Sequence, residues 1–225
     1  MPAQGALRDR DGGLALIETL RREADGTFVR RDRHLARLRA SAAALDFVHD
    51  DGAVEKALDS LSGRDGPLRV RLELARDGTA TVTAAPFAAM PEGTVWRLRL
   101  ATVHLDPADP LLRHKTTRRA AYDAARAEFT LDLADEVLLL NTRGEVCEGT
   151  FTNIFASMDD GGPLLTPPLA CGLLAGVLRQ ELLESGKARE AVLTPADLRA
   201  AKALFVGNSL RGLIAARLAE RTAAT

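Results

Sequence analysis

The stretch DEVLLLNTRGEVCEGTFTNIF, residues 135–155, decides the fold because it joins a buried strand to the next part of the same sheet. Residues 136–141 are mostly apolar over a short run, which is typical of a strand buried on both faces. Residues 145–156 continue the sheet, and Glu148 lies at a bend in it, just before Gly149. This carboxylate could be an ordinary edge group at a turn, or it could face the nitrogen of a bound aromatic ring.

Upstream of this stretch, the segment Asp106-Pro107-Ala108-Asp109-Pro110 indicates a domain boundary. Two prolines so close together exclude a helix interior and a central strand. We therefore predict a small N-terminal α+β domain over 1–105, a linker over 106–112 and a larger C-terminal domain over 113–225.

Alternating and helical apolar patterns fill both predicted domains. Leu68–Leu74 alternates with strict period two, Asp77-Gly78 makes a turn, and Thr79–Ala85 supplies the partner strand. The other elements predicted for the first domain are strands at 14–21, 27–30 and 95–103, a helix capped by Asp32 and a helix at 52–61. Together they predict antiparallel strands with helices on one face. The second domain should hold helices at 118–130, 176–184 and from 194, and a buried strand at 203–206.

The composition excludes several classes of partner. Thirty basic and 31 acidic residues give a net charge of -1, so no general attraction to nucleic acid or membrane is expected. No run approaches the roughly 18 apolar residues of a membrane helix, and the polar N-terminus does not resemble a signal peptide. Cys147 and Cys171 form neither a metal-ligand cluster nor a disulfide framework. We therefore expect no metal and a cytoplasmic protein.

Lys115 is the candidate reactive amine. It follows the proline-rich segment, and His114, Arg118 and Arg119 place cations around it, which favours the neutral, nucleophilic form of an amine. Without chemistry to perform, a lysine at this position would simply be solvated.

Two further features suit a phosphate group. The turn CGLLAG, residues 171–176, leads into a helix, and the first N–H groups of a helix attract anions, although many packing helices begin this way. Arg37, in an arginine-rich helix, and Asn208, after a buried strand, could add donors. An amine for a Schiff base, a carboxylate and a phosphate site are what pyridoxal phosphate requires of a protein.

In chain order these motifs resemble the class IV (fold type IV) family of pyridoxal phosphate-dependent aminotransferases and lyases. The matching segments are LIETLR (16–21), HLARL (34–38) with SA (41–42), HKTTRR (114–119), DEVLLLN (135–141), RGEV (143–146), EGTFTN (148–153), TPP (166–168) and GLLAGV (172–177). They extend over nearly the whole chain from residue 14 onward. The resemblance implies an α+β fold of two domains, a small α/β sandwich and a larger domain with a β-barrel-like sheet and flanking helices.

The resemblance also implies a role for individual residues. Lys115 would form the Schiff base with pyridoxal phosphate and later move protons, Glu148 would bind the pyridine nitrogen, and Thr19 would assist proton transfer. The phosphate would be held by Arg37, Gly176, Val177 and Asn208, the middle two through backbone amides.

Within the family, the segments ETLR (18–21), KTTRR (115–119) with Tyr122, and NSLRG (208–212) are most similar to 4-amino-4-deoxychorismate lyases. Such enzymes form 4-aminobenzoate and pyruvate on the route to folate. A homodimer and aminodeoxychorismate synthase as a possible partner are implied in the same way. The loop after Leu74 is shorter than in stand-alone lyases, so the candidates for binding substrate carboxylates are Arg69, Arg71 and Arg211.

Two alternatives to this activity stay open. One is an aminotransferase acting on D-amino, branched-chain or other primary amines, because the chemistry after proton removal is shared. The other is a non-catalytic binding module of the same fold.

Overall fold

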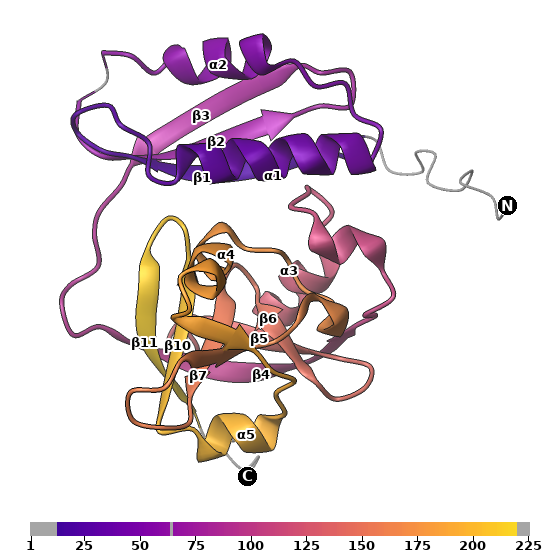
Figure 1. The fold of residues 1–225 in the computed structure, drawn as a ribbon, viewed down its shortest axis with the longest axis vertical. Helices are drawn as coiled ribbons and strands as arrows, with labels where there is room; N and C mark the ends of the chain where they lie inside the picture. The colour runs from indigo at the N-terminus through magenta and orange to yellow at the C-terminus, as the bar shows by residue number, and fades with distance from the viewer. Residues whose placement is uncertain (1–12, 64, 220–225) are drawn as a thin grey trace, which may run out of the picture. The chain divides into compact units, whose positions relative to one another are not determined.

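The computed structural model describes residues 13–63 and 65–219, and its contacts divide the chain into two units (Figure 1). The first unit extends to Phe87 and includes Lys115–Arg118, and the second comprises Ala88–His114 and the chain from Arg119 onward. This division differs from the predicted boundary after residue 105. A period-two pattern predicts a strand at residues 95–103, but it does not show which sheet the strand joins.

The first unit is a three-stranded antiparallel sheet with two helices on one face (Figure 1). The strand order is β1 (Leu16–Arg22), β2 (Leu68–Leu74) and β3 (Ala80–Pro86). Helix α1 (Arg31–Ala44) contacts β1, and α2 (Asp51–Asp59) contacts β3. The four aliphatic residues of β2 are buried in this core whereas Arg69 and Arg71 are exposed. The alternation in the sequence therefore predicted both the strand and its buried face.

Two local predictions for this unit were wrong. Residues 27–30 make only an isolated bridge, Arg22 to Phe28, because the chain turns into α1 at Arg30, which has a φ of 57°. Asp32 does not cap α1: Arg30 is the N-cap residue, its side chain makes no capping hydrogen bond, and Asp32 lies in the first turn.

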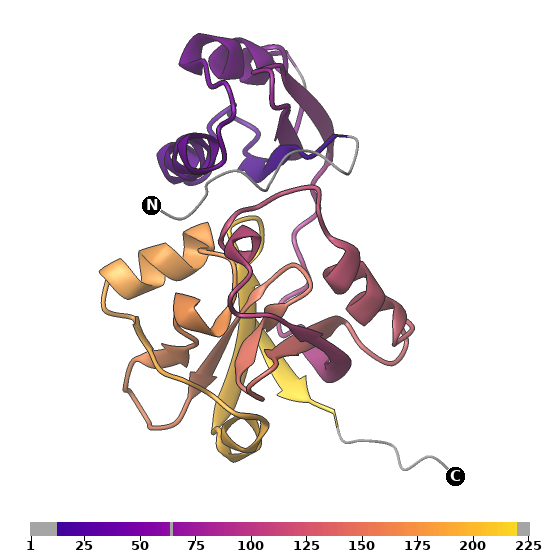
Figure 2. The same cartoon turned by 90° about the vertical axis from the view of Figure 1, so that its right-hand side faces the viewer.

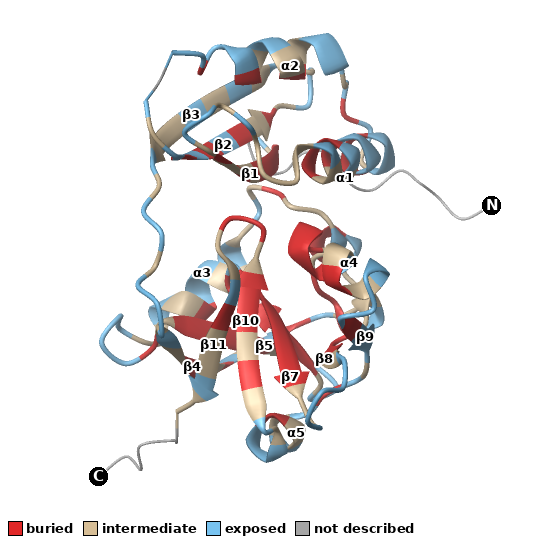
Figure 3. Cartoon of the chain, turned by 60° about the vertical axis from the view of Figure 1, so that its left-hand side comes forward, coloured by how far each residue is buried: buried red, intermediate tan, exposed pale blue. Residues whose placement is uncertain are grey.

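The second unit is an eight-stranded mixed sheet that forms a half-barrel (Figure 3). Its strands, in sheet order, are β6 (Val146–Gly149), β5 (Glu136–Asn141), β4 (Val95–Leu105), β11 (Gly212–Leu218), β10 (Ala203–Asn208), β7 (Asn153–Ser157), β8 (Leu164–Thr166) and β9 (Ala188–Glu190). A tight connection joins β6 to β7, with the N–H of Gly149 donating to the carbonyl of Thr152 at 2.7 Å. The curvature of the half-barrel therefore brings β6, at one edge of the sheet, close to β7, which lies within the sheet.

Helices flank this sheet on its outside (Figure 2). Helix α3 (Ala120–Ala127) contacts β4 and β5, and α4 (Val177–Glu184) contacts β9 and β10. The remaining helices are α5 (Pro195–Ala200) and the 3-10 turns Pro110–Arg113 and Leu169–Cys171. The first of these turns begins within the predicted linker, and its Leu111 and Leu112 are buried.

Strand β4 corrects the prediction of a third antiparallel strand in the first domain. It pairs in parallel with β5, where Leu98 lies opposite Glu136, and in parallel with β11, where Val95 lies opposite Ala215. The second of these partners, β11, was not predicted at all. In the part of the chain that the structure describes, no helix has the length and apolar character needed to cross a membrane.

Candidate active site

Glu148 is a buried carboxylate at the end of β6, with 4% of its surface exposed. Its Oε1 accepts a 2.7 Å hydrogen bond from the Tyr122 hydroxyl and a 3.1 Å bond from the Leu174 N–H. Its Oε2 lies 3.4 Å from the side-chain nitrogen of Asn153. A carboxylate this deeply buried needs such donors, and here they come from α3, β7 and the turn before α4.

A second buried carboxylate, Glu136, fixes the turn that follows Glu148. It accepts hydrogen bonds from the Thr150 N–H at 3.0 Å, the Thr150 hydroxyl at 2.6 Å and the Thr152 hydroxyl at 2.8 Å. Burial raises the pKa of Glu136, whereas these hydrogen bonds act to lower it. Gly149 makes room for the group, because a Cβ there would lie 2.7 Å from the carboxylate.

The glycine-rich turn lies next to Glu148. Asn153 connects the two, since its side-chain nitrogen also donates to the Leu174 carbonyl at 3.2 Å, and an added Cβ on Gly176 would overlap the Asn153 Oδ1. Gly176 is the N-cap residue of α4, which begins at Val177, and within the described residues no side chain caps this helix. Its first N–H groups are therefore suited to an anion.

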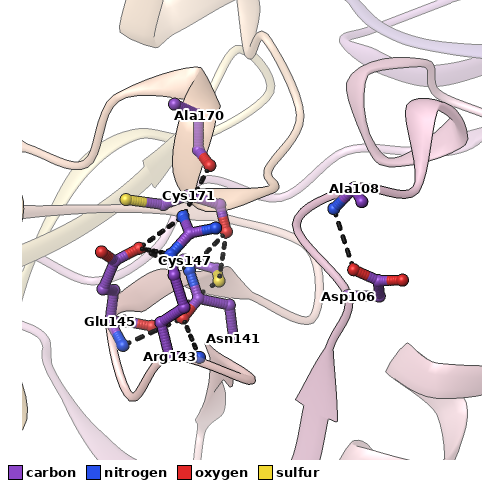
Figure 4. A network of polar contacts seen from close by, with 8 residues as sticks. All are labelled: Asp106, Ala108, Asn141, Arg143, Glu145, Cys147, Ala170 and Cys171. Atoms are coloured by element: carbon purple, nitrogen blue, oxygen red, sulfur yellow. Dashed lines mark hydrogen bonds and ion pairs between the residues drawn. The ribbon is translucent and has the colours of Figure 1, made fainter.

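A polar network anchors the start of this turn (Figure 4). Asn141, the last residue of β5, and Arg143, in the connection to β6, both donate to Glu145 Oε2 at 2.7 Å. The same two side chains donate at 2.9 Å to the carbonyls of Ala170 and Cys171. Burial raises the pKa of Cys171 to about 11, so its thiol stays neutral near pH 7. The network ties the β5–β6 connection to the segment that enters the turn.

Asn208, at the end of β10, uses its side chain within the fold. Its Oδ1 accepts from the Arg211 N–H at 3.0 Å, and its Nδ2 donates to the Phe151 carbonyl at 3.2 Å. The preceding residue, Gly207, packs closely on α4, because a Cβ there would lie 2.9 Å from Leu178 Cδ2. The end of β10 is thus beside the first turn of α4. Phosphate binding by Asn208 and carboxylate binding by Arg211 stay predictions.

Lys115 lies in the first unit, where its segment pairs with the start of β1. Leu16 bridges Thr116 in antiparallel fashion, and the Ile17 N–H donates to the Lys115 carbonyl at 2.8 Å. Paired residues share one face of a sheet and adjacent residues alternate. Since Leu16 and Thr116 are on the helix-covered face, Lys115 lies on the opposite face, together with Ile17 and Thr19.

Two arginines share that face. In the β1–β2 register, Thr19 is opposite Arg71 and Arg21 is opposite Arg69. Arg71 also forms a 2.8 Å ion pair with Glu73 two residues along its strand. The fold of the first unit therefore brings the predicted amine, the predicted proton-transfer threonine and two predicted carboxylate-binding arginines onto one sheet surface.

Arg37 has a partner that the sequence did not reveal. Its Nε and Nη2 donate to the two carboxylate oxygens of Glu18 at 2.9 and 2.6 Å, and His34 Nδ1 lies 2.6 Å from the same carboxylate. Burial raises the pKa of Glu18, but Arg37 and His34 together lower it further, to about 2. Glu18 lies on the helix-covered face of the sheet. A phosphate contact by Arg37 stays a prediction, and Arg37 would then serve Glu18 and phosphate together.

Comparison with known proteins identifies the family of this chain. Residues 15–219 match the family model described as amino-transferase class IV. The chain belongs to this family. The predicted family and the predicted α+β fold of type IV are thus confirmed.

Three relatives of this class IV chain show the range of names in the family. A crystal structure described as a "Putative amino-acid aminotransferase" from Mesorhizobium loti is 54% identical, with a TM-score of 0.90, and covers 92% of this chain and 100% of that one. A "Putative aminodeoxychorismate lyase" from Schizosaccharomyces pombe is 30% identical over 83% of both chains. A "Probable branched-chain-amino-acid aminotransferase" from Thermotoga maritima is 28% identical over 90% of this chain and 76% of the relative.

Class IV enzymes use pyridoxal phosphate, and the residues present here fit that cofactor. In the second unit, the buried carboxylate of Glu148 would hold the ring nitrogen, and the start of α4 at Gly176, which no described side chain caps, would hold the phosphate. Lys115, in the first unit, is half-buried, and its role as the amine stays a prediction.

Sequence analysis assigned no role in the site to several residues that surround it. Tyr122, Asn153 and the Leu174 N–H surround Glu148, and Glu136 holds the neighbouring turn. A signal existed for Glu136 alone, because a charged residue that opens an otherwise apolar strand must be hydrogen-bonded when buried.

Proposed function

We propose that this class IV chain is a pyridoxal phosphate-dependent lyase that converts 4-amino-4-deoxychorismate to 4-aminobenzoate and pyruvate. The observation that carries the proposal is the sheet face of the first unit. Lys115 and Thr19 share that face with Arg69 and Arg71. The proposed substrate bears two carboxylates, and guanidinium groups bind carboxylates through paired hydrogen bonds. The relative from S. pombe that is named as a lyase supports the same activity.

In this proposal, different residues carry out the successive steps of a β-elimination. Bound pyridoxal phosphate supplies an electron sink for the charge that develops when a proton leaves the carbon next to the substrate amine. The Lys115 Nζ takes that proton, and the Glu148 carboxylate favours a protonated ring nitrogen. The C–O bond to the enolpyruvyl group breaks, and the six-membered ring becomes aromatic. The proton held on Lys115 then passes, directly or through the Thr19 hydroxyl, to the methylene carbon of the departing enolate and gives pyruvate.

A second candidate is an aminotransferase, favoured by the name of the M. loti protein at 54% identity. Both reactions begin with the same proton removal, so Lys115 and Glu148 serve either one. They differ in whether the substrate has a leaving group at the next carbon and in how its carboxylates are held.

The experiment that separates them is a direct product assay. The purified protein, loaded with pyridoxal phosphate, is incubated with 4-amino-4-deoxychorismate and, separately, with amino acids plus a 2-oxo acid. We expect 4-aminobenzoate and pyruvate in equal amounts, and none from Lys115→Ala. Transamination without 4-aminobenzoate would refute the lyase proposal and support the aminotransferase.

Substrate recognition gives a second check. We expect Arg71→Gln to raise KM for 4-amino-4-deoxychorismate about tenfold or more, because a charge-assisted hydrogen bond contributes about 1.5–3 kcal/mol. Arg199→Gln is the matched control, since Arg199 is exposed on α5 in the other unit. An equal KM in both variants would remove Arg71 from the substrate site.

A further inference from the structure

Tyr122 makes the shortest hydrogen bond described for Glu148. Its hydroxyl donates to Glu148 Oε1 at 2.7 Å, whereas the Leu174 N–H is at 3.1 Å and the Asn153 nitrogen is at 3.4 Å from Oε2. Two donors thus converge on one carboxylate oxygen. This asymmetry sets the rotation of the carboxylate, because turning it would break both bonds to Oε1 at once.

The position of the tyrosine ring is itself fixed by Arg119. The Arg119 guanidinium lies 4.9 Å from the centre of the Tyr122 ring, and its Nη2 donates to the Thr150 carbonyl at 2.5 Å. Thr150 belongs to the turn held by Glu136. Arg119 therefore connects the Tyr122 ring to the turn that follows Glu148. This connection restricts the distance between the Tyr122 and Glu148 side chains.

The hydroxyl can act only as a donor to this carboxylate. Burial raises the pKa of Tyr122 strongly, and the adjacent negative charge of Glu148 raises it further. Tyr122 consequently keeps its proton near pH 7. A permanent donor of this kind favours the ionised form of the carboxylate that accepts from it.

We propose that Tyr122 is a positioning residue for the cofactor: it orients Glu148 and keeps it ionised, so that the carboxylate can hold a proton on the pyridine nitrogen. This inference rests on the proposed function to the extent that Glu148 faces that nitrogen. It applies to the lyase and the aminotransferase equally, because both need an electron-poor ring.

The test compares Tyr122→Phe with wild type in two measurements. Phenylalanine keeps the ring and its packing on Arg119 and removes only the hydroxyl. We expect Tyr122→Phe to bind pyridoxal phosphate about tenfold more weakly, as expected for the loss of a hydrogen bond to a charged group. With ¹⁵N-labelled pyridoxal phosphate, we also expect the ring-nitrogen NMR signal to move toward the value of an unprotonated pyridine.

Thr166→Val is the matched control. Thr166 is fully buried in the same unit, and its hydroxyl has no hydrogen-bond partner among the described residues. Removing that hydroxyl should change neither the affinity nor the ¹⁵N signal. Thermal unfolding of all variants identifies any loss of folding, and the ¹⁵N signal is read only from the bound, folded fraction.

A double-mutant cycle shows whether Tyr122 acts through Glu148. In a Glu148→Gln background, we expect Tyr122→Phe to weaken binding less than twofold. If wild type binds pyridoxal phosphate and Tyr122→Phe matches it in affinity and ¹⁵N signal, the role of Tyr122 is refuted and the proposed function stands. If the effect is equally large in the Glu148→Gln background, Tyr122 does not act through Glu148. If wild type binds no pyridoxal phosphate, the proposed function itself fails, and this role fails with it.

Discussion

Gly176→Ala is the substitution that most directly probes how the turn before α4 is built. The backbone there has φ −66° and ψ 139°, which alanine adopts without strain. The added Cβ, however, would overlap Asn153 Oδ1. Asn153 would have to move, and it would lose its hydrogen bonds to the Leu174 carbonyl and to Glu148.

The size of the effect follows from these contacts. Forcing an extra carbon into a packed site costs about 1–3 kcal/mol, and losing the Asn153 hydrogen bonds costs about 1 kcal/mol each. Replacing glycine restricts the unfolded chain and offsets about 0.4–1 kcal/mol. We expect a net loss of about 3 kcal/mol, which lowers Tm by roughly 6–12 °C in a chain of this size. Affinity for pyridoxal phosphate should fall as well, since the Asn153 donor to Glu148 is displaced.

Thermal unfolding and a pyridoxal phosphate titration measure both effects. Gly162→Ala is the control, because a Cβ at this exposed position would make only an ordinary contact of 3.7 Å with Asp159. In an Asn153→Ala background the clash is absent, so Gly176→Ala should then cost less than about 0.5 kcal/mol. An equal loss of stability in both backgrounds would refute the reasoning.

Three further predictions concern stability. The pKa of Glu18 is lowered from 4.5 to about 2, so its contribution to the free energy of unfolding is complete above pH 4.5 and is lost as the pH falls toward 2. Between pH 5 and 3, the free energy of unfolding measured in urea should therefore fall by about 2 kcal/mol more in wild type than in Glu18→Gln. Glu136→Gln turns an amide N–H₂ toward the Thr150 donors that now bond to a carboxylate, so it should lower the free energy of unfolding in urea by about 3 kcal/mol. The control Glu92→Gln, at an exposed position, should change it almost not at all. Equal stability of the two variants would show that the hydrogen bonds of Glu136 do not stabilise the turn. Gly207→Ala places a Cβ 2.9 Å from Leu178 and should lower Tm by several degrees, and an unchanged Tm would show that α4 can move away from β10.

Local patterns predicted most elements and missed how the strands pair. The runs at 68–74 and 136–141 became β2 and β5 with the predicted bounds, because alternation and apolar runs report burial directly. Strand β11 was not predicted, and β4 was assigned to the wrong sheet. Both depend on a parallel pairing between residues more than 100 positions apart, for example Val95 with Ala215, and no local pattern encodes such a partner.

The candidate site shows the same division. Motifs in the sequence identified the family, and with it pyridoxal phosphate as the cofactor that class IV enzymes use. Motifs also singled out Lys115 and Glu148, whose roles stay predictions. The donors around Glu148 were not predicted, because Tyr122 and Leu174 approach it only through the packing of α3 and of the turn against β6.

By itself, then, the sequence of this chain determined its family, its α+β composition and the candidate reactive groups, since these depend on residue types at fixed spacing. Only the tertiary structure decided that Arg37 is paired with Glu18, and that Lys115 shares a sheet face with Thr19 and Arg71. The reason is physical: burial obliges each charged group to find a partner, and that partner is chosen by which strands and helices meet in space.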